Sequence, residues 1–155
     1  MGRLDQDTEG LLILTNVGDL NHRITHPSFE IEKEYEAIVE GSPSKGALDR
    51  IEAGVMIESR KTAPAKITDV ERRQRETRVR LVIHEGRKRQ VRRMFSVIGH
   101  EVRELRRLRV GGVHLGSLAR GDWRDLESHE LYALGVDYGR VVDGYRKLKS
   151  PTKSP

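Results

Sequence analysis

The apolar residues of this chain recur with two periods, which separate extended segments from helical ones. Residues 33–40 alternate between charged and apolar side chains, which predicts a half-buried strand with Tyr35 on its inward face. Residues 65–70 and 77–84 show a similar alternation on either side of an arginine-rich turn, as in an antiparallel pair. Residues 11–15 are almost continuously apolar, which indicates a buried strand.

The helical period is clearest after residue 90, where an apolar stripe at i, i+3, i+4 and i+7 ends at Gly99. That stripe consists of Val91, Met94, Phe95 and Ile98. Weaker patterns bounded by capping or helix-breaking residues predict short helices before Pro27, between Ser44 and Gly54, and over residues 128–134.

Three further apolar segments, residues 102–108, 113–115 and 123–126, continue the run of strands towards the C-terminal end. Strands and helices first alternate and then give way to a run of strands. This order predicts an α+β fold with a mixed or mostly antiparallel sheet.

The length of 155 residues suits one domain, which we expect to cover residues 1–137. Residues 138–155 form a basic tail containing Ser and Pro, with little to bury, and are expected to be disordered. The chain has no cysteine and no apolar run long enough to span a membrane. We therefore expect a cytoplasmic protein without membrane contacts.

Positive charge is concentrated in one part of the chain, the basic band of residues 72–109. This band has 14 Lys and Arg against 4 Asp and Glu, a local net charge of +10. Because the whole chain carries +5, the remaining residues carry −5. The arginine-rich band favours a surface that binds nucleic acid, although a solvated surface crossed by salt bridges has the same composition.

A loop rich in carboxylates precedes the first apolar run, with Asp5, Asp7 and Glu9 just before residues 11–15. A rigid strand after such a loop would fix a reactive carboxylate in place. Turn and capping hydrogen bonds by the same side chains are the alternative.

The sequence of this loop resembles the signature of the RsuA/RluB branch of ribosomal RNA pseudouridine synthases. That signature reads G-R-L-D-x-D/N-T-x-G-L-L-L-L-T-N-D-G, and this chain departs from it at Val17, where the family usually has Asp. The resemblance continues through Leu20–Arg23, His26–Pro27, Glu32–Tyr35, Glu85–Phe95 and Leu105–Gly111.

The resemblance implies a curved mixed sheet with flanking helices and an RNA cleft across it. Members of this branch carry an S4-like RNA-binding domain, a linker and a further strand before the G-R-L-D loop. Because this chain begins at that loop, we expect a catalytic fold that is incomplete at its N-terminus, with an exposed apolar edge near Leu11–Leu14.

The resemblance also assigns roles to individual residues. It places the catalytic carboxylate at Asp5, its ion-pair partner at Arg92, the active-site tyrosine at Tyr35 and an apolar wall of the base pocket at Leu105. The residues expected to hold the RNA backbone are Arg3, Arg87, Lys88, Arg89, Arg93 and Arg107.

The implied reaction is the isomerisation of one uridine to pseudouridine in ribosomal RNA, by a monomer that needs no cofactor and no metal. The Glu32–Tyr35 stretch favours the large-subunit RNA over the small-subunit RNA. The sequence does not identify the uridine. It also does not show whether the carboxylate attacks C1′ or C6 or acts through a glycal.

Two alternatives to this enzyme remain open, of which the first is a noncatalytic RNA-binding or ribosome-assembly module. The second is a sugar-nucleotide enzyme that binds a metal through the D-x-D sequence of Asp5 and Asp7. His22 and His26 also have a metal-compatible spacing, but we interpret them as structural or RNA-facing because no further ligand follows the usual pattern.

Overall fold

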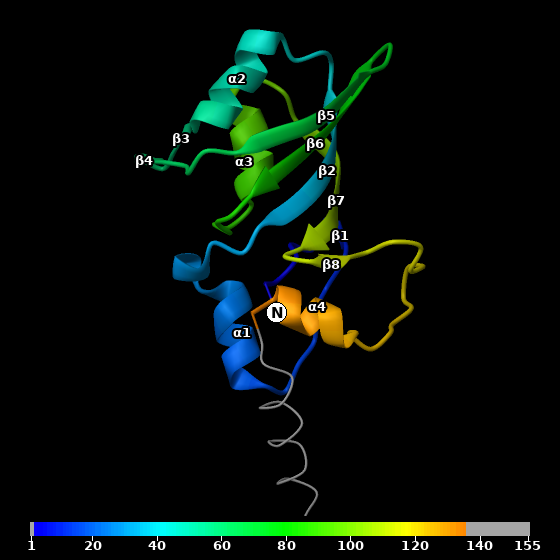
Figure 1. Cartoon of the computed structure of the whole chain (residues 1–155). Coiled ribbons are helices and arrows are strands. Elements are labelled where there is room, and N and C mark those ends of the chain that lie inside the picture. The colour runs from blue at the N-terminus through cyan, green and yellow to red at the C-terminus, as the bar shows by residue number, and fades with distance from the viewer. Residues whose placement is uncertain (1, 136–155) are drawn as a thin grey trace, which may run out of the picture.

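A computed structural model describes residues 2–135, and these residues form an α+β fold built on a curved sheet (Figure 1). The six-stranded sheet has the order β1-β7-β2-β6-β5, with β8 also paired to β7. Its strands are β1 (Glu9–Gly10), β2 (Lys33–Glu40), β5 (Lys66–Arg72), β6 (Glu76–Ile83), β7 (Val102–Val110) and β8 (Val113–His114). The β1–β7 pair is parallel and the others are antiparallel, which confirms the predicted fold class.

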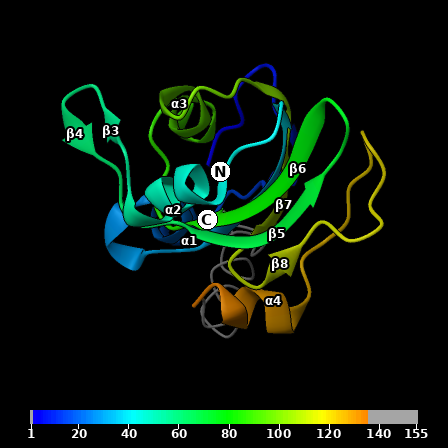
Figure 2. The same ribbon diagram turned by 90° about the horizontal axis from the view of Figure 1, so that it is seen from above.

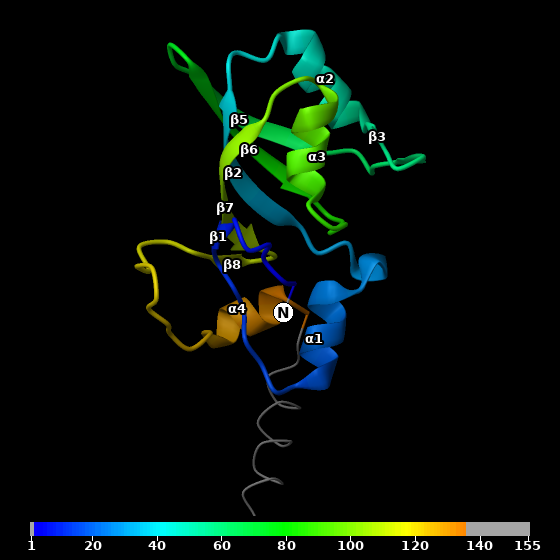
Figure 3. The same cartoon turned by 180° about the vertical axis from the view of Figure 1, so that it is seen from behind.

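The remaining elements are a second, two-stranded sheet and the helices. They comprise β3 (Met56–Ile57), β4 (Arg60–Lys61), α1 (Gly18–Thr25), the 3-10 helix η1 (Pro27–Phe29), α2 (Lys45–Ala53), α3 (Gln90–Val97) and α4 (Ser128–Ala133). Seen from above, α2 and α3 lie inside the curve of the sheet (Figure 2). The view from behind shows α1 and α4 at the opposite end of the molecule (Figure 3). None of the helices in residues 2–135 is sufficiently long and apolar to cross a membrane.

Two clusters of buried apolar residues account for this arrangement. The first lies under α2 and α3 and includes the predicted stripe residues Val91, Met94 and Phe95, all of them buried. The second lies under α1 and α4, where Ile24, Val113 and Leu134 are at most 1 % exposed. Ser44 caps α2 as predicted, because its hydroxyl accepts a hydrogen bond from the amide of Ala47 at 3.2 Å.

The predicted strand over residues 11–15 is wrong, because pairing with β7 ends almost as soon as it begins. Only Glu9 and Gly10 are paired, and the amide of Leu11 then makes one more bond to the carbonyl of Arg107 at 2.9 Å. Strand β8 takes the same edge of β7 from Arg109 onwards, so no free edge remains for the apolar run. The side chains nevertheless alternate between buried and exposed, and Leu14 is 80 % exposed.

Two other segments near the C-terminal end depart from the predictions or cannot be compared with them. Residues 123–126 form no strand, and Trp123 is 82 % exposed. The basic tail of residues 138–155 and the boundary predicted at residue 137 lie outside the described residues.

Gly10 is required where the N-terminal loop meets the sheet. Its φ is +104°, and a Cβ atom placed there would lie 2.2 Å from the carbonyl oxygen of Arg107. No side chain fits at that distance, so this glycine allows the loop to lie directly on β7.

A buried carboxylate makes the attachment of α4 sensitive to acid. Glu130 accepts two bonds from the Arg124 guanidinium, at 2.6 and 2.7 Å, and one from the amide of Glu127 at 2.9 Å. The Arg124 guanidinium lowers the pKa of Glu130 from 4.5 to about 2.

We expect the stabilisation from this pair to be complete above pH 4.5 and to be lost as the pH falls towards 2. Because Arg124 is 38 % exposed, we expect a loss of about 1–2 kcal/mol. Denaturant unfolding of wild type and Glu130→Gln across this pH range measures the difference in their unfolding free energies. This difference should shrink as the pH falls. Asp49→Asn, in an exposed pair with Lys45, is the control and should have little effect at any pH.

Candidate active site

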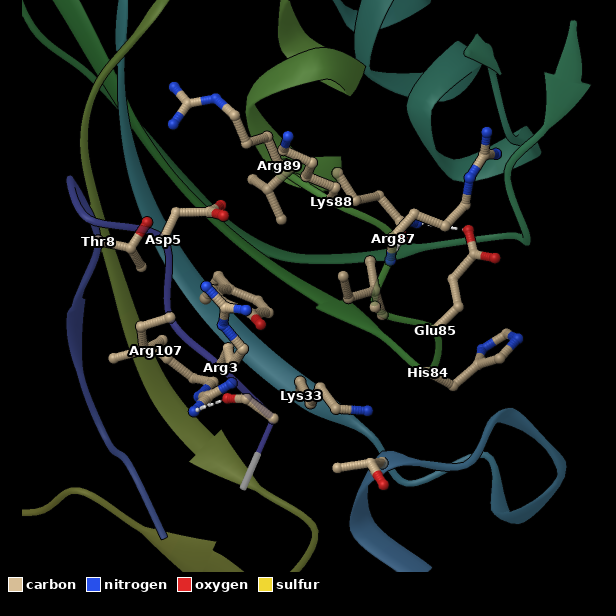
Figure 4. Close-up of a pocket in the computed structure, with 18 of the residues that line it drawn as sticks. Arg3, Asp5, Thr8, Lys33, His84, Glu85, Arg87, Lys88, Arg89 and Arg107 are labelled. Carbon is tan, nitrogen blue, oxygen red and sulfur yellow. Dashed lines mark hydrogen bonds between the residues drawn. The ribbon is translucent and has the colours of Figure 1, made fainter. Parts of the chain in front are cut away.

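A cavity of about 910 Å³ opens between the N-terminal loop, the start of β2, the β6–α3 loop and β7 (Figure 4). A volume of this order is sufficient for a nucleotide-sized ligand. Three residues predicted for the base-binding and catalytic site line it together, namely Asp5, Tyr35 and Leu105. They come from three separate segments of the chain.

Asp5 lies in the loop that precedes β1, and a turn fixes its main chain. The amide of Thr8 donates to the carbonyl of Asp5 at 2.9 Å. Within residues 2–135 the Asp5 carboxylate makes no hydrogen bond and no ion pair, and the hydroxyl of Thr8 is buried without a partner. Figure 4 shows both side chains together at one end of the cavity. The carboxylate is therefore free to engage a ligand.

Tyr35 and Leu105 form part of the cavity wall from adjacent strands. Tyr35 is half-buried in β2, opposite Leu81 of β6 and Arg107 of β7. Leu105 is buried in β7 and pairs with Ala37 of β2. The central strands thus place an aromatic and an aliphatic side chain in the cavity that also contains Asp5.

Arg92 contacts Asp7, whereas the family resemblance implied a contact with Asp5. Its guanidinium donates to the carbonyl of Val102 at 2.6 Å and to the carbonyl of Asp7 at 2.5 Å. Its Nε lies 3.2 Å from the Asp7 carboxylate. Since Arg92 is 9 % exposed and does not line the cavity, it fixes the loop that carries Asp5 rather than the Asp5 carboxylate.

Asp7 is the carboxylate through which this loop is attached to α3. Arg89, which precedes the helix with a left-handed φ of 52°, donates to both Asp7 oxygens at 2.8 and 2.9 Å. The Arg89 guanidinium, followed by the charge of Arg92, holds the pKa of Asp7 below its ordinary value although burial opposes the shift. Asp7 therefore has the structural role considered for this loop, whereas the Asp5 carboxylate makes no hydrogen bond or ion pair in the described residues.

The cations predicted to hold RNA differ in their availability. Arg3 and Lys88 are exposed, line the cavity and make no hydrogen bond or ion pair within the described part of the chain. Arg93 pairs with Glu58 at 2.7 Å, and Arg87 donates to the carbonyls of Ile57 and Arg60 in the β3–β4 hairpin.

Arg107 is 1 % exposed and donates to the carbonyls of Gly2 and Leu11, each at 2.8 Å. We therefore revise its predicted phosphate contact to a structural role in holding the N-terminal loop on β7.

Part of the basic band is used in ion pairs across the outer face of the sheet. Arg78 pairs with Glu36, Asp69 and Glu71, while Arg109 pairs with Glu32 and Glu34. The composition alone therefore overstated the free positive charge. Among the exposed cations of the band whose side chains make no hydrogen bond or ion pair in residues 2–135, Lys88 lines the cavity, whereas Arg75 and Arg106 lie outside it.

His22 of α1 and His26, which follows this helix, form an exposed ring cluster with Phe29. The rings of His22 and His26 are 4.8 Å apart, and Phe29 meets both of them edge-on. Nowhere in residues 2–135 do three His, Asp or Glu side chains gather in a group that could hold a metal ion, Asp5 and Asp7 included.

The sequence analysis did not single out Lys33, which is buried in the cavity wall. The signal was present, because Lys33 has the same parity along β2 as the inward-facing Tyr35, Ala37 and Val39. Lysine side chains are mostly exposed to solvent, so the type of residue alone argues against a buried position for Lys33.

Comparison with known proteins gives a consistent family assignment. Residues 1–97 match the family model described as RNA pseudouridylate synthase. The ribosomal large subunit pseudouridine synthase B of Bacillus subtilis (strain 168) is 45 % identical over 144 residues, which cover 90 % of this chain and 59 % of that protein. The ribosomal small subunit pseudouridine synthase A of Yersinia pestis is 39 % identical over 140 residues, 88 % of this chain and 58 % of that protein.

A solved structure described as a pseudouridylate synthase has the same fold. It superposes with a TM-score of 0.77 at 36 % identity, and the match covers 84 % of this chain and 56 % of that one. The chain thus spans somewhat more than half the length of the relatives it matches.

Proposed function

Because this chain belongs to the RNA pseudouridylate synthase family, we propose that it isomerises a uridine to pseudouridine in ribosomal RNA, with Asp5 as the catalytic carboxylate. The observation that carries this proposal is the free Asp5 carboxylate in a cavity shared with Tyr35 and Leu105. The target base would have to leave its stack to reach that cavity, at a cost of a few kcal/mol.

The reaction breaks the bond between N1 of the base and C1′ of the ribose, rotates the base and joins its C5 to C1′. The proton on C5 is lost and N1 gains one, so that no electrons enter or leave. A carboxylate suits this chemistry because it can attack C1′ or C6, or remove a proton from the sugar. Tyr35 would stack on the extruded base or assist the proton transfer, and Leu105 would form an apolar contact with the base.

Ribosomal RNA is the proposed substrate class, with the large-subunit RNA favoured over the small-subunit RNA. The 45 % identical relative is named for the large subunit, and the 39 % identical one for the small subunit. The Glu32–Tyr35 stretch supports the same preference.

A noncatalytic RNA-binding or ribosome-assembly module is the competing function. Exposed cations at the cavity would serve either role, whereas a free carboxylate among them weakens the binding of a polyanion and is useful only for chemistry. Mapping of pseudouridines in ribosomal RNA from cells with and without this gene separates the two. Loss of one pseudouridine is the expected result, and an unchanged map would support the noncatalytic function.

The proposed RNA contact predicts a specific salt dependence. Arg3 and Lys88 have no partner in the described part of the chain, so their joint replacement by Ala removes charge without breaking a protein contact. We expect the slope of log affinity against log salt to become shallower by about 0.7–0.9 for each lost phosphate contact. Filter binding to ribosomal RNA fragments measures this slope. Arg50→Ala on α2, outside the cavity, is the control, and an equal slope in both variants would contradict the prediction.

A further inference from the structure

Lys33 is a buried cation at the opposite end of the cavity from Asp5 (Figure 4). It is 7 % exposed and begins β2, between Ile83 of β6 and Val110 of β7. Its ammonium donates to the carbonyl of Ile31 at 2.9 Å, the one hydrogen bond that the group makes within residues 2–135. An ammonium has three donors, so this bond leaves capacity for a ligand.

No carboxylate in the described part of the chain balances this charge. A second buried cation, Arg107, lies near enough for its charge, together with burial as the larger cause, to lower the pKa of Lys33. In the described part of the chain, Arg107 likewise bonds only to main-chain carbonyls. Buried charges are normally paired, because an unpaired charge loses its hydration without compensation.

The carboxylates of the cavity wall are engaged or distant. Glu85 accepts bonds from the amide of Ala63 and from Gln90, and Asp5 lies at the other end. Glu32 and Glu34, which flank Lys33 in the sequence, are both paired with Arg109. This end of the cavity therefore carries the positive charge of Lys33 without a counterion from residues 2–135.

We propose that Lys33 binds a backbone phosphate of the RNA strand that carries the target uridine, with the charge of Arg107 behind it. This inference rests on the proposed function for the identity of the strand. A phosphate is favoured over a base carbonyl because two neighbouring cations require an anion, and a neutral acceptor would leave their charge uncompensated. Lys33 thus positions the nucleotide, whereas Asp5 acts on it.

The first test replaces the ammonium with a side chain of similar length. In Lys33→Met, the salt slope for a short single-stranded RNA with one central uridine should become shallower by about 0.7, and the affinity near 0.1 M salt should fall about five-fold. Lys33→Arg should retain both. Lys66→Met, an exposed lysine at the start of β5, is the matched control and should leave both unchanged. The proposal would be overturned if thermal melting shows that Lys33→Met is folded and its salt slope equals that of the wild type.

The second test removes the charge from the RNA instead, which leaves the wild-type fold intact. A neutral methylphosphonate linkage is moved along the same oligonucleotide. At one position, the wild-type chain should lose about five-fold in affinity, and Lys33→Met or Lys33→Gln should lose nothing further. The phosphate contact would be refuted if wild type, Lys33→Met and Lys33→Gln lose affinity equally at every position of the neutral linkage.

Further measurements separate this inference from neighbouring explanations. A changed preference for uridine over cytidine with an unchanged salt slope would assign Lys33 to a base carbonyl and overturn the phosphate contact. One outcome is that the wild type and the Lys33 variants all fail to form pseudouridine in ribosomal RNA and still differ in salt slope and in the affinity lost at the neutral linkage. In that case the proposed function fails while the phosphate site stands.

Discussion

Replacing Asp5 with Asn should abolish pseudouridine formation and leave RNA affinity within a few-fold of the wild-type value. The substitution keeps the size of the side chain but removes its charge and nearly all of its nucleophilicity. Because the carboxylate makes no hydrogen bond and no ion pair within residues 2–135, the fold should be little affected. We expect the rate to fall by about a thousand-fold or more, as is usual when a catalytic nucleophile is removed.

The assay for this variant is chemical detection of pseudouridine in unmodified ribosomal RNA fragments, beside filter binding with the same protein. Asp7→Asn is the matched control, since it makes the same change two residues away on the same loop. It weakens the contacts to Arg89 and Arg92, so it should act mainly through folding and have a milder effect on the rate. Substantial activity in Asp5→Asn would remove the enzyme assignment and leave the RNA-binding module.

Replacing Arg92 with Ala should have the largest effect on stability. The change leaves the carbonyls of Val102 and Asp7 without their buried donor and removes one ion-pair partner of the Asp7 carboxylate. A carbonyl left without its donor costs about 1–3 kcal/mol of unfolding free energy, whereas the pair with the exposed Asp7 carboxylate, which keeps Arg89, adds little. The loop that carries Asp5 would also shift, and a displacement of about 1 Å is enough to reduce the rate by about 100-fold.

Denaturant unfolding and single-turnover pseudouridine formation measure these two effects. Arg93→Ala is the control on the same helix, because Arg93 makes a partly exposed pair with Glu58 and should cost about 1 kcal/mol or less. Arg92→Lys should recover only part of the stability, since a single ammonium cannot bond Val102 and both groups of Asp7 in the same geometry. Equal stability of Arg92→Ala and Arg93→Ala would show that the buried contacts contribute little.

The sequence predicted the elements that depend on local patterns. The apolar stripe from Val91 to Ile98 marked α3, and the alternation in residues 65–70 and 77–84 marked the β5–β6 hairpin. These patterns determine structure directly, because a helix or hairpin is formed by residues close in the chain. The family resemblance predicted that Asp5, Tyr35 and Leu105 belong to one site, and all three line the same cavity.

The predictions that failed depended on contacts between distant segments. Composition could not show that Arg107 is buried, and spacing could not show whether Arg92 would contact Asp5 or Asp7. Residues 11–15 have the composition of a strand, but β8 occupies the edge that they would need. Partner choice and edge availability are tertiary properties, which local propensity does not contain.

The parallel pairing of β1 with β7 has a consequence for how the protein is made. Glu9 and Gly10 meet Arg106 and Arg107, so the loop that carries Asp5 acquires its support only after nearly a hundred further residues have left the ribosome. Until then the β5–β6 hairpin and α2 can form from nearby residues, whereas closure of this long loop carries an entropic cost. The loop that carries Asp5 is thus ordered later than the hairpin and α2, although it precedes both of them in the chain.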